Sequence, residues 1–171
     1  LIRAGAGADN ALVDRGPHPV AGGLAVAGTG PATEYAQAGW AGIQIDGPHG
    51  GLRNVSRGDE QFLVFNIQNP IALRDNLRQS ALELILLLRS LDSLRVDAST
   101  LQELASADVR FYLDLVALMG HSVGVRIAPL AMAFEPRFDA MIVSGAGASW
   151  LENVLYKERP SATRPIRPWL C

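Results

Sequence analysis

The chain has 171 residues, of which 49% are hydrophobic and 19% charged, and its formal net charge is -2. This composition is typical of one globular domain with a sizeable core and excludes a disordered chain. The slightly negative charge implies no basic face, so we expect no nucleic-acid partner.

The sequence shows neither the pattern of a transmembrane segment nor the cysteines that an internal disulfide needs. Uninterrupted apolar runs such as residues 84–88 are far shorter than the ~20 residues that span a bilayer, so we expect no transmembrane segment. The opening residues Leu1-Ile2-Arg3 show no charged start before an apolar block, so we expect no signal peptide in this sequence. A single cysteine, Cys171, excludes an internal disulfide.

The first third of the chain alternates short apolar runs with turn residues. In chain order we predict an irregular start (1–21), a buried strand (22–27), a helix (31–38) ended by Gly39, a second strand (41–45) and an irregular DGPHGG loop (46–51). A strand, a helix and a strand within about 25 residues indicate a parallel βαβ unit.

The middle third contains the most regular helical pattern. Apolar residues recur at helical spacing from Leu73 to Leu91, with charged and amide side chains between them, which predicts a helix over about 71–91. Residues 52–70 before it are polar, with one apolar patch at 62–65. Residues 92–108 after it read as a polar connection, with at most one helical turn at 101–105.

The last third repeats the alternation of strand and helix. We predict a strand (115–119), a helix (125–134), a further strand (138–143) ending at Ser144, and a basic, proline-rich irregular end (156–171). The pattern predicts a single α/β domain over 1–171, with a mostly parallel sheet and flanking helices.

A short glycine-bounded motif joins the third predicted strand to its helix. Gly120, His121, Ser122, Val123 and Gly124 form a G-x-S-x-G sequence. A sharp strand-to-helix turn exposes the serine hydroxyl, and the two glycines allow the backbone to close up. The amide of Val123 then lies at a helix start, where unpaired N–H groups favour an oxyanion. We interpret Ser122 as a nucleophile in a nucleophile elbow.

Three motifs in this order resemble the α/β-hydrolase superfamily: 25–30 (AVAGTG), 42–50 (GIQIDGPHG) and 120–124 (GHSVG). The segments 66–70 (NIQNP) and 74–79 (RDNLRQ) are similar to bacterial lipase-like and esterase-like members. The resemblance covers residues 22–147 and corresponds to the N-terminal portion of the fold. Ala27 stands where the family often has histidine, and Val125 where a glycine commonly follows the elbow.

The resemblance implies a serine esterase or lipase-like activity without a cofactor. Ser122 would attack the carbonyl carbon of a small-molecule or lipid ester. The amides of Val123 and Thr29, the latter following Gly28, would form the oxyanion hole. Separately, no histidine pair or histidine–cysteine pair has metal-ligand spacing, so we expect no metal.

The partners that a catalytic serine needs are missing downstream of it. A serine needs a histidine base oriented by a carboxylate, and in the family both follow the serine. All three histidines (His18, His49 and His121) precede Ser122, and the later acids are Glu135, Asp139, Glu152 and Glu158. We expect His121 to pack or hydrogen-bond beneath the elbow, His49 to stabilise its loop and Asp46 to cap a turn.

The fold implied by the resemblance would continue with about two more strands, which carry the acid and the histidine. We therefore expect this chain to be one piece of a longer polypeptide and to hydrolyse esters poorly by itself. Lipase-like relatives are often exported, to the periplasm or beyond; without export the protein would be cytoplasmic. The sequence leaves the compartment, the substrate and the oligomeric state open.

Two alternatives compete with the hydrolase interpretation. The first is a dinucleotide-binding oxidoreductase, because residues 28–33 (GTGPAT) approach G-x-G-x-x-G and Asp46 ends the next strand. Thr33 replaces its third glycine, however, and the Gly120–Gly124 motif is left unexplained. The second is a non-catalytic hydrolase-like binding module, which the missing histidine and acid favour.

Overall fold

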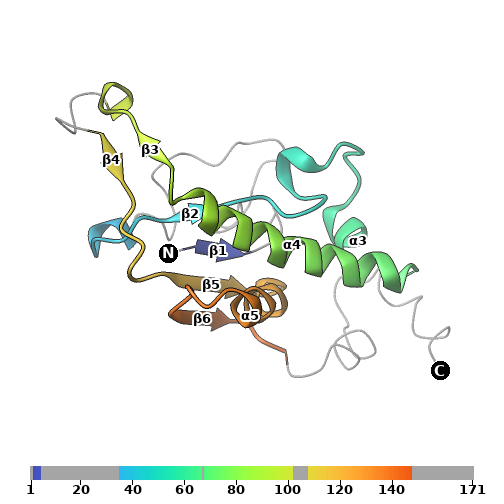
Figure 1. The fold of residues 1–171 in the computed structure, drawn as a ribbon. Helices are drawn as coiled ribbons and strands as arrows, with labels where there is room; N and C mark the ends of the chain where they lie inside the picture. Colours follow the sequence, from blue (N-terminus) through green and yellow to red (C-terminus); the bar gives the residue numbers. More distant parts are fainter. Residues whose placement is uncertain (1, 5–34, 67, 102–107, 148–171) are drawn as a thin grey trace.

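The fold was analysed in a computed structural model, in which residues 2–4, 35–66, 68–101 and 108–147 are described. These residues form a four-stranded parallel sheet, two main helices and a small two-stranded ribbon (Figure 1). The predicted mixed α/β architecture with a parallel sheet is therefore confirmed for this part of the chain. None of its helices is long and apolar enough to cross a membrane.

The main sheet has the order β2-β1-β5-β6, and every pair is parallel. Its second strand in space, β1 (Ile2–Ala4), lies between β2 (Ile43–Gln44) and β5 (Ala117–His121). The interpretation of residues 1–21 as irregular is thus wrong for these three residues. Their glycine- and alanine-rich surroundings hid a strand too short to show periodicity. The predicted strand 22–27 lies outside the described residues.

The longest pairing joins β5 to β6 (Ala140–Ser144) in a register of five residues. Both strands were predicted, but each begins two residues later than expected. Before β5 starts, the amide of Val116 donates a hydrogen bond to the Asp139 carboxylate (2.7 Å), and the Asp139 amide donates one to the Val116 carbonyl (2.8 Å). These two bonds fix the strands at their amino ends.

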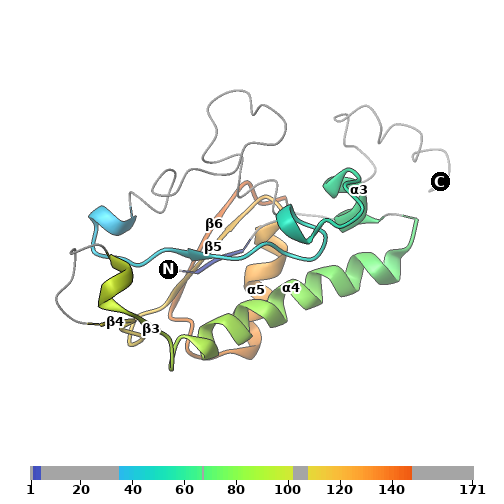
Figure 2. The ribbon, with the colours of Figure 1, turned by 90° about the horizontal axis from the view of Figure 1, so that it is seen from above.

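Helix α4 (Pro70–Ser90) matches the predicted 71–91 segment closely. It begins where Asn69 accepts a hydrogen bond from the Ala72 amide (3.2 Å), with Pro70 in the first turn. Its apolar stripe packs against α5 (Gly124–Phe134) and the sheet, and both helices lie on the same face of the sheet (Figure 2).

The core lies between these two helices and the sheet. Its fully buried side chains come from both helices and the sheet: Leu84 and Leu88 from α4, Leu118 from β5, and Ala128 and Ala131 from α5. Each large aliphatic side chain of this kind contributes about 1.5–3 kcal/mol through its burial. The core thus holds α5, and the turn before it, firmly against β5.

The opposite face of the sheet is contacted by the helical residues 35–37. Since strand side chains alternate, Met119 faces away from the Leu118 side, and its sulfur accepts a hydrogen bond from the Tyr35 hydroxyl (3.3 Å). The segment ends as predicted at Gly39 (φ +84°), where the Trp40 amide donates to the Tyr35 carbonyl. This Schellman arrangement requires the left-handed conformation that glycine adopts readily.

Several short elements fall in stretches that the sequence marks as polar connections. Helix α3 (Glu60–Phe65) contains the apolar patch, and a 3-10 turn, η1 (Gly51–Arg53), follows the predicted irregular loop. The 92–108 connection contains β3 (Arg95–Val96) and a 3-10 turn, η2 (Ala98–Leu101); β3 pairs antiparallel with β4 (Val109–Arg110). Strands of two residues are too short to show an alternating hydrophobic pattern, so the sequence did not predict the ribbon.

Candidate active site

The turn between β5 and α5 has the backbone shape that the G-x-S-x-G motif predicts. Ser122 has φ +54°, a left-handed conformation that non-glycine residues rarely adopt. It follows directly on β5 and is exposed, while the next residue, Val123, is buried at the helix start. The structure thus holds the serine in a strained turn, as expected for a residue whose position is imposed by its surroundings.

The glycines flanking Ser122 are buried within this turn. A Cβ atom on Gly120 would lie 2.5 Å from the Gly124 carbonyl oxygen and 3.1 Å from the Val125 amide nitrogen. Only glycine therefore permits the strand to approach the helix this closely. Val125 is half-buried without disrupting the turn, since its amide donates to the Ser122 carbonyl (3.2 Å).

The start of α5 offers N–H groups near the serine. No side chain caps this helix end, and the Val123 amide makes no hydrogen bond to the described part of the chain. The unpaired amides and the positive end of the helix dipole favour an anion there. Val123 can therefore serve as the predicted oxyanion donor, whereas Gly28 and Thr29 lie outside the described residues.

The sheet topology places Ser122 at a favourable edge. The chain passes from β1 to β2 on one side and then to β5 on the other, so the strand order reverses between β1 and β5. In open parallel sheets, ligands bind beyond the carboxyl ends of the strands at such a reversal. Ser122 follows the carboxyl end of β5, beside this reversal.

His121 is positioned against β6. Its Nδ1 atom lies 3.3 Å from the Ser144 hydroxyl, and a Cβ atom added at Gly145 would lie 3.2 Å from its Cε1 atom. The hydrogen bonding expected of His121 is found, but its side chain is exposed instead of packed under the turn.

The two described acids downstream of Ser122 lie at the far end of the sheet. Asp139 precedes β6 and bonds to Val116, six residues before Ser122, or roughly 20 Å along an extended strand. Glu135 follows the last residue of α5, about 16 Å along an 11-residue helix from its start. Neither can orient a base at Ser122. Glu152, Glu158 and His18 lie outside the described residues.

The 46–51 loop follows β2 and is held by two residues that sequence reasoning did not single out. Arg53 donates to the Asp46 carbonyl (2.8 Å) and forms two bonds to Glu83 of α4 (2.5 and 2.9 Å). The hydrogen bond from Arg53 is the main reason why the pKa of Glu83 is lowered. No spacing links positions 30 residues apart, so the sequence carries no signal for this pair.

Within the loop, Asp46 lies against Gly51, and the loop-stabilising role expected of His49 stays a prediction. The Asp46 carboxylate lies over Gly51, where a Cβ would collide with its Oδ2 atom, and His49 is exposed with φ +63°. Both residues follow the carboxyl end of β2, the same sheet edge as Ser122. A hollow beside this loop is bounded by Asp46, Arg53, Glu83 and α4, and Ser122 does not line it.

Comparisons with protein-family models, curated proteins and solved structures gave no match to this chain. Within the described residues, no three histidine, cysteine or acidic side chains are grouped so that they could hold a metal ion. The interpretation of the site therefore depends on the geometry of the turn at Ser122.

Proposed function

We propose that this protein is a serine hydrolase of carboxylic esters, related to the α/β-hydrolase superfamily, with Ser122 as its nucleophile. One observation carries the proposal: an exposed serine with φ +54° stands between a parallel strand and a helix, and the next amide, that of Val123, makes no hydrogen bond to the described part of the chain. Backbone strain at a non-glycine residue costs about 1–3 kcal/mol and is concentrated at functional sites.

The proposed reaction is acyl transfer through the serine. The Ser122 oxygen forms a bond to the ester carbonyl carbon, its proton passes to a base, and the Val123 amide donates to the oxygen that becomes negative. The carbon–oxygen bond to the leaving group then breaks, and the alcohol departs with that proton. Water hydrolyses the acyl-serine to the carboxylic acid and restores the hydroxyl.

The base of this reaction is not identified by a contact: no hydrogen bond joins a described histidine or carboxylate to the Ser122 hydroxyl. His121 bonds to Ser144, and the two described acids downstream of Ser122, Glu135 and Asp139, lie at the opposite edge. We expect the chain of 171 residues alone to turn over esters slowly. Sequencing the gene beyond the codon for Cys171 tests whether a histidine and an acid follow in frame.

The direct test is covalent labelling of the serine in the complete gene product. A fluorophosphonate should modify Ser122, as mapped by peptide mass spectrometry, and p-nitrophenyl butyrate hydrolysis should be lost in Ser122→Ala. Ser93→Ala, an exposed serine after α4, is the matched control and should keep full activity. Equal activity in Ser122→Ala and the unmodified protein would refute the proposal.

A second candidate function is a non-catalytic hydrolase-like binding module. It is favoured because no described histidine or carboxylate hydrogen-bonds to the Ser122 side chain, and because Glu135 and Asp139 lie at the far end of the sheet. The labelling experiment separates the two, because a module without a base leaves Ser122 unmodified by the fluorophosphonate even in the complete gene product.

A further inference from the structure

We propose that the amino edge of the sheet, opposite Ser122, carries a separate binding site for a small anionic amphiphile such as a medium-chain carboxylate. The site is a hollow of about 380 Å³. It is lined by Ile43, the first residue of β2, by Val116, the residue before β5, and by Leu91 at the end of α4. This volume falls within the range of about 300–1,000 Å³ of small-molecule sites.

Most of the side chains that line the hollow are apolar. Aromatic and aliphatic side chains line it, including Trp40, Ile43, Phe111 and Leu113. Tyr112 and Leu115 also line it and remain 78% and 53% exposed. An apolar molecule entering this space would remove those side chains from water. This burial stabilises the complex by roughly 25 cal/mol per Å² of buried apolar area.

One charged residue borders this apolar space. Arg110 of β4 is the only charged residue that the described part of the chain contributes to the lining. It is the register partner of Arg95 on β3, so two cationic side chains project from the same face of the ribbon. Neither forms a salt bridge to a described residue. Like charges directly opposite each other are destabilising, and an anion between them removes that repulsion.

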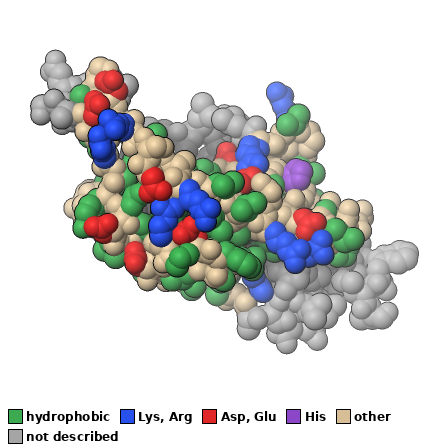
Figure 3. All heavy atoms as spheres, viewed as in Figure 1, with side chains coloured by type: hydrophobic (Ala, Val, Ile, Leu, Met, Phe, Trp, Pro, Cys, Tyr) green, Lys and Arg blue, Asp and Glu red, His purple; other side chains and the backbone are tan. Residues whose placement is uncertain are grey.

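The acidic residues of the ribbon are engaged with backbone amides. Asp97 accepts a hydrogen bond from the Ser99 amide (2.8 Å) and Asp108 one from the Ala98 amide (3.2 Å). In Figure 3 the basic side chains on the ribbon form one group, with the acidic ones beyond it. Figures 1 and 2 both show the ribbon projecting beyond the end of α4, at the edge where the strands begin.

This combination selects the chemistry of the ligand. An apolar hollow fits an alkyl or aryl body, and the arginine at its border fits a carboxylate, to which guanidinium groups donate in pairs. Val116 and Ser122 are separated by roughly 20 Å of extended chain, so the ligand lies apart from the nucleophile. The proposal therefore does not depend on ester hydrolysis.

Isothermal titration calorimetry with octanoate, and with octan-1-ol as its neutral counterpart, tests the site in the full chain. We expect Arg110→Gln to weaken octanoate binding at low salt at least about threefold, with a smaller effect at high salt, and to leave octan-1-ol binding unchanged. Ala41→Phe, which fills the hollow, should weaken both ligands. Arg78→Gln, an exposed arginine on α4, is the matched control and should change neither.

Three results would overturn the proposal. They are no octanoate binding at millimolar concentration, an octanoate affinity in Arg110→Gln equal to that of the unmodified protein, or octanoate and octan-1-ol affinities in Ala41→Phe that both equal those of the unmodified protein. Circular dichroism and melting curves of each variant identify any loss of folding, and Arg95→Gln gives a second exposed variant that should also weaken octanoate. Ser122→Ala should bind octanoate normally, so failure of this site is distinguishable from failure of the hydrolase proposal.

Discussion

The amide of Ser122 donates a hydrogen bond of 3.0 Å to the carbonyl oxygen of Ser144 at the end of β6. This bond continues the parallel ladder between β5 and β6 past the last strand residue and into the turn. The nucleophile's backbone is consequently held by the neighbouring strand on one side and by the buried start of α5 on the other. The strained φ of Ser122 is imposed by both.

The close approach of Gly120 to the helix predicts a severe effect of one methyl group. In Gly120→Ala, the new Cβ would meet the backbone at Gly124, which cannot move away without shifting α5. We expect a loss of about 2–3 kcal/mol in the free energy of unfolding, measured by urea denaturation. Gly147→Ala, at the same sheet edge with only the Arg126 side chain 3.9 Å away, should change it by less than about 0.5 kcal/mol. Similar values for the two variants would contradict the tight contact between β5 and the start of α5.

The left-handed conformation of Ser122 predicts opposite effects of two substitutions. Ser122→Gly removes the steric penalty of roughly 1 kcal/mol, whereas Ser122→Val places a β-branched side chain where φ is +54°. We expect the glycine variant to be more stable than the valine variant by about 1–2 kcal/mol in thermal or urea unfolding. Both variants should lose fluorophosphonate labelling, because both lack the hydroxyl, so they should differ in stability but not in labelling. A valine variant as stable as the glycine variant would show that the turn is not strained.

The sequence predicts well those parts of the fold in which a hydrophobic pattern recurs over many residues or a motif requires one backbone geometry. The apolar positions from Leu73 to Leu91 specify a helix because they recur at helical spacing over 19 residues, and Gly120 specifies a turn because only glycine fits there. The proposed catalytic assignment remains a prediction, as does the oxyanion role of Thr29.

The parts that sequence did not predict depend on contacts between distant positions. β1 is a three-residue strand that is recognisable only by its pairing with β2 and β5. The two-residue strands of the Arg95–Arg110 ribbon are equally short, and the Arg53–Glu83 pair joins positions without a common pattern. Such features arise from tertiary packing, which a local periodicity cannot encode.

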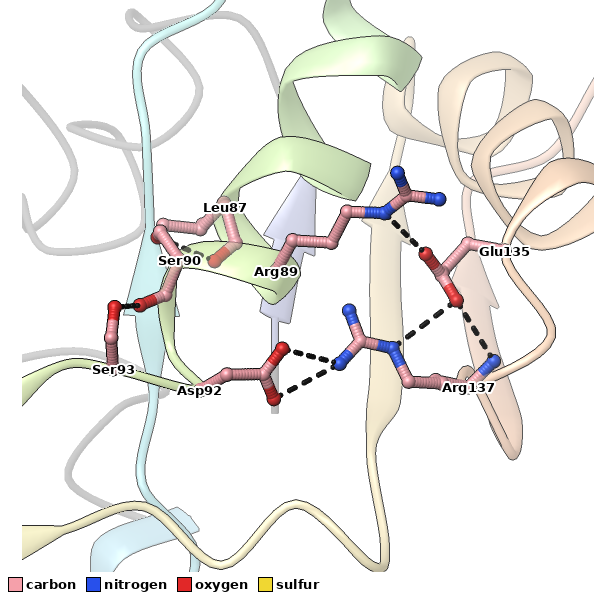
Figure 4. A network of polar contacts seen from close by, with 7 residues as sticks. All are labelled: Leu87, Arg89, Ser90, Asp92, Ser93, Glu135 and Arg137. Carbon is pink, nitrogen blue, oxygen red and sulfur yellow. Dashed lines mark hydrogen bonds and ion pairs between the residues drawn. The ribbon is translucent and has the colours of Figure 1, made fainter.

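A buried carboxylate joins the ends of the two main helices. Glu135, the only buried charged residue of the described part, accepts hydrogen bonds from Arg89 (3.1 Å) and Arg137 (3.2 Å), and Arg137 also bonds to Asp92 (Figure 4). In Glu135→Gln the negative charge is lost, and one of the two accepting oxygens is replaced by an NH2 group that faces an arginine donor. We expect Glu135→Gln to lower the free energy of unfolding by about 1–3 kcal/mol in urea denaturation.

The matched control for Glu135→Gln is Asp75→Asn. Asp75 pairs with Arg74, but both side chains are 52% exposed, and exposed pairs contribute little. Asp75→Asn should therefore change the free energy of unfolding by less than about 0.5 kcal/mol. If the two substitutions had equal effects, the Glu135 network would be no more important than a surface pair.

The pKa of Glu135 predicts how this stabilisation depends on pH. Burial acts to raise the pKa, but the hydrogen bonds from Arg89 and Arg137 outweigh it, and the folded pKa lies below the ordinary value of 4.5. Between these two pKa values the unfolded chain binds the proton more readily than the folded one, so acid favours unfolding. The carboxylate's contribution is complete above pH 4.5 and is lost as the pH falls through the folded pKa. The difference in unfolding free energy between the unmodified protein and Glu135→Gln should hence be constant from neutral pH to about 5.5 and shrink below 4.5. A difference that grows on acidification would mean that the arginines do not stabilise the ionised form.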